Sequence, residues 1–88
     1  MIMPVDLSRL ELIDQLLQPI QKLIRSILPN FVKKDLRDPE VRELIVAAVD
    51  KALVAQFPAA GFIPSNLRKS IIRKQLDIII DDIVLGGG

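Results

Sequence analysis

Apolar residues recur at helical spacing along the first third of the chain, and this periodicity limits the folds open to it. Between residues 6 and 28 they step alternately by three and four positions, the heptad pattern of a helix with one buried side. The residues that follow this pattern are Leu10, Ile13, Leu17, Ile20, Ile24 and Ile27. Further leucines widen the stripe, so this helix is expected to contact more than one neighbour. Pro19 lacks an N–H donor and is expected to kink or split the helix.

Two further helices are predicted after proline-containing connections. Asp38 and Pro39 are a typical N-cap and first position for a helix over 39–56. Its expected buried stripe is Val41, Leu44, Ile45, Ala48, Val49 and Ala52. The third helix is expected to begin after a cap at Ser65 or Asn66 and to end near Leu85. The sequence therefore predicts an all-α fold, a small three-helix bundle forming one domain over 1–85, with a flexible glycine tail over 86–88.

The connection over 57–66 is unusually apolar for a loop. Phe57, Phe62 and Ile63 are expected to fold back and cap the core, and the alternative is that they bind a partner.

The third helix carries two apolar stripes instead of one. The main stripe is Ile72, Leu76, Ile79, Ile80 and Ile83. The second stripe, which we call the outer stripe, is Leu67, Ile71, Ile78 and Leu85. A helix with two apolar faces is expected to lie between neighbours, and a three-helix monomer needs only one such face. The outer stripe therefore predicts self-association or a protein partner.

The charges of the third helix oppose its dipole, because cations are favourable late in a helix and anions early. The basic residues near its start are Arg68, Lys69, Arg73 and Lys74, and the acidic residues near its end are Asp77, Asp81 and Asp82. One interpretation is that these charges fix the orientation of the third helix against the first helix, whose charge gradient runs the opposite way. A second is an antiparallel dimer in which Arg73 and Lys74 face the acidic end of another copy. A third is an anion site at the helix start, extended by Lys33, Lys34 and Arg37.

Residue composition argues against catalysis. The chain has no histidine and no cysteine, which removes the commonest general base, thiolate nucleophiles and most zinc sites. No glycine-rich phosphate loop occurs, and Asp77, Asp81 and Asp82 lack the spacing of a calcium loop. We therefore expect no enzyme activity, no catalytic residue, no cofactor, no metal and no small-molecule substrate.

These features favour a non-enzymatic interaction or assembly module, an adaptor or dimer whose partner is itself or another protein. Nucleic-acid backbone binding is the alternative, disfavoured by a net charge of only +1 and by the absence of aromatic residues near the basic group. Association of the first helix with a membrane surface is a second alternative, disfavoured because its polar face is mixed in charge. No signal peptide or transmembrane run is recognisable, so a cytoplasmic location is expected.

Overall fold

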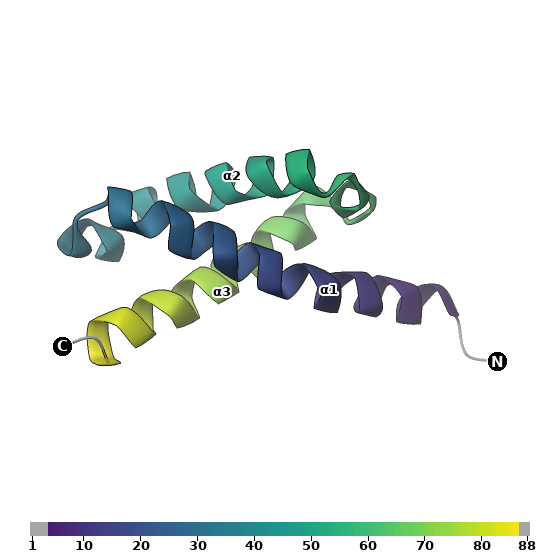
Figure 1. Cartoon of the computed structure of the whole chain (residues 1–88), viewed down its shortest axis with the longest axis horizontal. Helices are drawn as coiled ribbons and strands as arrows, with labels where there is room; N and C mark the ends of the chain where they lie inside the picture. The colour runs from purple at the N-terminus through teal and green to yellow at the C-terminus, as the bar shows by residue number, and fades with distance from the viewer. Residues whose placement is uncertain (1–3, 87–88) are drawn as a thin grey trace.

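The chain folds into three α-helices joined by short 3₁₀ segments (Figure 1). The computed structural model describes the backbone of residues 4–86 and the side chains of residues 11–84. The α-helices are α1 (Pro4–Ile27), α2 (Pro39–Gln56) and α3 (Ser65–Gly86), and the 3₁₀ segments are η1 (Leu28–Asn30), η2 (Lys33–Arg37) and η3 (Pro58–Phe62). No strand occurs within residues 4–86. The predicted all-α three-helix bundle is confirmed.

Local sequence signals explain most of the helix boundaries. The Asp38 carboxylate accepts a hydrogen bond of 2.9 Å from the backbone N–H of Glu40, which confirms the predicted cap of α2. In α3 the backbone N–H of Arg68 donates to the carbonyl oxygen of Pro64 at 2.9 Å, so the helix begins at Ser65, one or two residues earlier than a cap at Ser65 or Asn66 predicts. α1 runs unbroken through Pro19, so this proline does not split the helix. Gly86 is the last residue of α3, whereas Gly87 and Gly88 lie outside the described residues.

The axes of the three helices are not aligned with one another. Figure 1 shows that α2 runs antiparallel to both α1 and α3, while α1 and α3 cross and diverge toward their ends. The amide of Gln21 in α1 donates to the Gln75 side chain in α3 at 2.9 Å, which joins the two helices in their middle parts. The last turn of α1 lies near the end of α3, since Arg25 and Ile83 line the same hollow, but no ion pair joins α1 to α3 among the described side chains. The predicted match between the charge gradients of these two helices thus forms no ion pair among these side chains.

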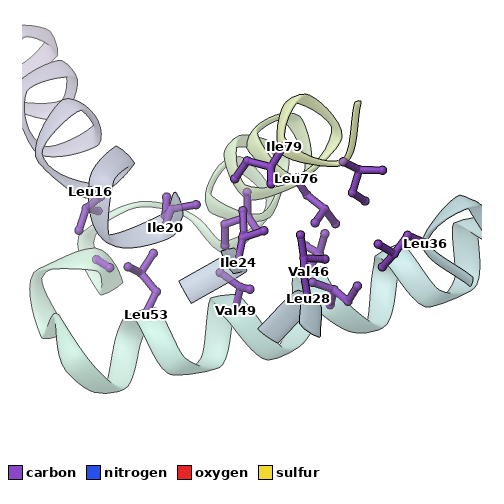
Figure 2. Packing of buried hydrophobic residues seen from close by; sticks show 14 of the residues in the cluster. Leu16, Ile20, Ile24, Leu28, Leu36, Val46, Val49, Leu53, Leu76 and Ile79 are labelled. Atoms are coloured by element: carbon purple, nitrogen blue, oxygen red, sulfur yellow. The ribbon is translucent and has the colours of Figure 1, made fainter. Parts of the chain in front are cut away.

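The core lies where all three helices converge (Figure 2). Aliphatic side chains from each helix fill it, together with Leu28 of η1, Leu36 of η2 and Ala60 of η3. The fully buried members are Ile20, Ile24, Ile45, Val46, Val49, Leu53, Ile72, Leu76 and Ile80. The main stripe predicted for α3 is thus the buried one, with Ile83 packed at its edge.

The buried face of α2 contains Ile45 and Val49 of the predicted stripe but differs from it elsewhere. Leu44 is 65% exposed and Ala48 is exposed, whereas Val46 and Leu53 are buried. The face is rotated by roughly one residue, about 100°, from the expected stripe. The physical reason is area, because burying Val46 and Leu53 removes more apolar surface from water than burying alanines does.

The apolar connection between α2 and α3 caps the core only in part. Ala60 and Ile63 are buried, but Phe62 is 81% exposed and Phe57 also reaches solvent. The expectation that both phenylalanines cap the core is therefore wrong, because the 3₁₀ turn of η3 directs Ala60 inward in their place.

Candidate functional site

The outer stripe of α3 faces away from the core. Leu67 is 42% exposed and Ile78 is 54% exposed, while Ile71 is half-buried and packs against the edge of the core. Leu85 belongs to α3, but its side chain lies outside the described residues. The structure thus leaves apolar side chains on the solvent side of α3, whose opposite side is already buried in the core.

The basic residue Arg68 does not face solvent. Its guanidinium binds the Asp50 carboxylate of α2 through two nitrogens, Nε to Oδ1 and Nη2 to Oδ2, the latter at 3.1 Å. The remaining nitrogen donates to the carbonyl oxygens of Ile63 at 2.8 Å and Ala60 at 3.3 Å. Only 12% of the Arg68 side chain and 11% of the Asp50 side chain are exposed. Arg68 therefore ties α2 and η3 to α3 and is withdrawn from the predicted anion patch.

The hydrogen bonds that Arg68 donates to Asp50 also affect the pKa of the arginine. They raise the pKa of the guanidinium above its ordinary value, against the opposing effect of burial. The guanidinium is therefore held in its charged form. Each nitrogen of the guanidinium already donates to an acceptor within the chain. The group therefore has no free pair of nitrogens for bidentate binding of an anion.

Two more ion pairs join α3 to α2 at the surface. Arg73 holds Glu43 in a bidentate pair, with Nε to Oε2 at 2.6 Å and Nη2 to Oε1 at 2.8 Å. Asp77 accepts from Arg42 at 2.7 Å, and the Arg42 Nε donates to the carbonyl oxygen of Leu36 at 2.6 Å. The reversed charges of α3 are therefore matched by α2, which runs antiparallel beside it.

Three of the predicted charged residues remain on the solvent side of α3. Lys74, Asp81 and Asp82 are exposed, and none of them forms an ion pair with another described side chain. Lys69 is half-buried and lies close enough to Glu43 to favour its ionised form. The predicted patch thus divides into residues bound to α2 and residues that border the outer stripe.

The Arg73 pair is expected to show in the titration of Glu43. The hydrogen bond from Arg73 lowers the pKa of this carboxyl below its ordinary value, with smaller help from Lys69. Any stability from this pair is present at neutral pH and is lost as the pH falls through the lowered pKa. We expect Arg73→Gln to raise the pKa of Glu43, measured by NMR titration of its side-chain carboxyl. Lys74→Gln on the same helix is the control and should leave the titration unchanged.

The basic residues of the first connection do not extend the start of α3. Lys33, Lys34 and Arg37 lie beside Ile83 and Val84, near the other end of that helix. Lys33 also borders a neighbouring hollow of about 290 Å³ whose remaining lining is Arg25, Leu28, Pro29, Phe31, Leu36 and Ile83. The predicted extension is wrong because the crossing of α1 over α3 brings the first connection to the C-terminal part of α3.

Sequence reasoning missed the α2 partners of α3. Asp50 stands in the apolar run over 45–55 and is only 8% exposed. Its spacing was the available signal, since it follows Val46 by four positions and precedes Leu53 by three. Once Val46 and Leu53 are placed on the buried face, Asp50 must be buried too and needs a cation. Arg42 and Glu43 had no comparable signal.

Within residues 4–86, no helix combines the length and the hydropathy that a bilayer crossing requires. Among the side chains of residues 11–84, no three from histidine, cysteine, aspartate or glutamate converge to hold a metal ion.

Comparison with known proteins gives no relative for this fold or surface: no family model, no curated protein and no solved structure matches the chain.

Proposed function

We propose that this protein is a non-enzymatic assembly module that associates with itself through the outer stripe of α3. The observation that carries the proposal is the exposure of Leu67 and Ile78 on a helix whose main stripe is already buried. Exposed apolar groups in a row along one helix form the kind of face that another helix covers.

The free energy available from burying the outer stripe supports weak self-association. Burying a fully exposed isoleucine side chain contributes about 1.5–3 kcal/mol, so Ile78, which is 54% exposed, gains about half of this in each copy of a symmetric contact. The stripe follows a single helix, so the interface belongs to the small, transient class and not to obligate dimers. Association is therefore expected to depend on protein concentration.

Analytical ultracentrifugation over a micromolar to millimolar series tests the proposal. We expect the wild-type chain to shift from monomer to dimer and Ile78→Ser to weaken dimerisation at least about tenfold, which is the effect of about 1.4 kcal/mol. The matched control is Leu44→Ser, which removes a similarly exposed leucine from α2, away from the outer stripe. A chain that stays monomeric throughout the series, or equal weakening by both variants, would contradict the proposal.

Anion binding by the start of α3 has less support. Arg68 and Arg73 already bind carboxylates of α2, which leaves Lys69 and Lys74 for an external anion. Membrane association through α1 gains no support from the described part of that helix, whose exposed residues there include both Glu11 and Lys22.

A further inference from the structure

We infer that the second copy binds α3 antiparallel, with a two-fold axis at Ile78, so that Lys74 of each copy faces the partner's Asp82. This inference rests on the proposed self-association and adds to it the orientation and the register of the two helices.

The register follows from the spacing of residues about Ile78. In an antiparallel two-fold pair, a residue a given number of positions before the axis meets the residue the same number after it. Lys74 stands four positions before Ile78 and Asp82 four after it, and Ile71 and Leu85 stand seven before and seven after. Steps of four and seven stay on one helix face. Opposite charges therefore meet, and apolar positions meet, in the same arrangement.

Other registers lack this agreement. An axis between Lys74 and Gln75 pairs Ile71 with the partner's Ile78 but brings the two Lys74 side chains together. An axis between Ile72 and Arg73 pairs Leu67 with the partner's Ile78 and sets Lys74 against the partner's Ile71. A parallel pair places Lys74 beside the partner's Lys74 and Asp82 beside the partner's Asp82, which repel. The axis at Ile78 is the arrangement among these that satisfies the charged positions together with Ile71, Ile78 and Leu85, and it leaves Leu67 at the margin of the contact.

The structure also decides which charges are available for this contact. Arg73 and Asp77 point to α2, where they bind Glu43 and Arg42. Lys74 and Asp82 are exposed on the outer side with Ile78 between them. Exposed ion pairs contribute little free energy, so these two select the orientation while apolar burial supplies the affinity.

Cysteine cross-linking tests the position of the axis, because the chain contains no cysteine of its own. A residue on a two-fold axis meets its own copy, so Ile78→Cys is expected to form an intermolecular disulfide under mild oxidation. Leu44→Cys, equally accessible but on α2, is expected to stay monomeric on a non-reducing gel. Equal cross-linking of both variants would overturn the proposed axis.

Charge exchange tests the pairing. Lys74→Glu and Asp82→Lys each place like charges opposite one another in a homodimer, and each is expected to weaken association by a factor of about 3–5, the scale of an exposed pair. Mixing the two variants restores opposite charges in both positions, so a mixed dimer is expected to form in preference to either homodimer. High salt should reduce this preference. The absence of any preference in the mixture would overturn the pairing.

These outcomes separate the register from the proposed function. If Ile78→Ser weakens dimerisation but the cross-link and the mixed dimer fail, the self-association stands and the register is wrong. If no dimer forms at any concentration, the proposed function itself fails.

Discussion

Arg68→Met is expected to destabilise the folded chain by about 3 kcal/mol, because it leaves the Asp50 carboxylate without its partner in a nearly buried position. The same change frees the carbonyl oxygens of Ala60 and Ile63, which lose the donor that links η3 to α3. Small domains have a total stability of about 5–15 kcal/mol, so the loss is a large fraction of it. Urea unfolding followed by circular dichroism at neutral pH measures the change.

Two further variants identify the cause of this loss. Arg68→Lys keeps the charge but cannot reproduce the bidentate contact together with the two carbonyl contacts, so it should recover only part of the stability. Asp50→Leu combined with Arg68→Met removes both charges and is expected to be more stable than Arg68→Met alone. If Arg68→Met changes stability by less than about 0.5 kcal/mol, Arg68 behaves as an ordinary surface residue and the structural role assigned to it is wrong.

Ile80→Ala is expected to destabilise the chain by about 3 kcal/mol, whereas Ile78→Ala should change the stability of the dilute monomer by less than about 0.5 kcal/mol. The two residues are of the same type and lie two positions apart on α3, but Ile80 is 1% exposed and Ile78 is 54% exposed. The first change leaves a cavity in the core, and the second removes atoms that already contact water.

Thermal and urea unfolding at low protein concentration compare the two isoleucine variants without interference from self-association. Ultracentrifugation at high concentration is expected to give the opposite order, with Ile78→Ala weakening dimerisation and Ile80→Ala affecting it little as long as the chain stays folded. Similar destabilisation of the dilute monomer by both variants would show that α3 is buried on both sides and would remove the surface on which self-association is proposed.

The helices and the buried face of α3 could be predicted from the sequence, because both follow from local capping signals and from the periodic spacing of apolar residues. Asp38 caps α2 through a hydrogen bond within its own turn. The main stripe of α3 repeats at the helical period, so Ile72, Leu76 and Ile80 belong to one face whatever that face contacts.

The charge partners of α3 could not be predicted in the same way. Both α1 and α2 carry charges that could match the reversed gradient of α3. Which of them supplies the ion-pair partners depends on how the helices pack. No ion pair joins α1 to α3 among the described side chains, and α2 supplies the partners Asp50, Glu43 and Arg42. The same lack of tertiary information led to a predicted α2 stripe that includes Ile45 and Val49 correctly but omits Val46 and Leu53. Alanines and larger apolar residues count alike in a pattern but not in buried area.

By itself the sequence determined that this chain is helical, where its helices begin and end to within about two residues, and that α3 has more apolar surface than one core contact needs. These properties depend on backbone hydrogen bonds, caps and side-chain spacing, all of which act within a few residues. Only the tertiary structure decided that Arg68 binds Asp50 in a nearly buried position and that Arg73 is paired within the chain. It also decided that Lys74 and Asp82 remain on the outer face beside Ile78. The physical reason is that an ion pair depends on the distance between two side chains, and the packing of the helices sets that distance.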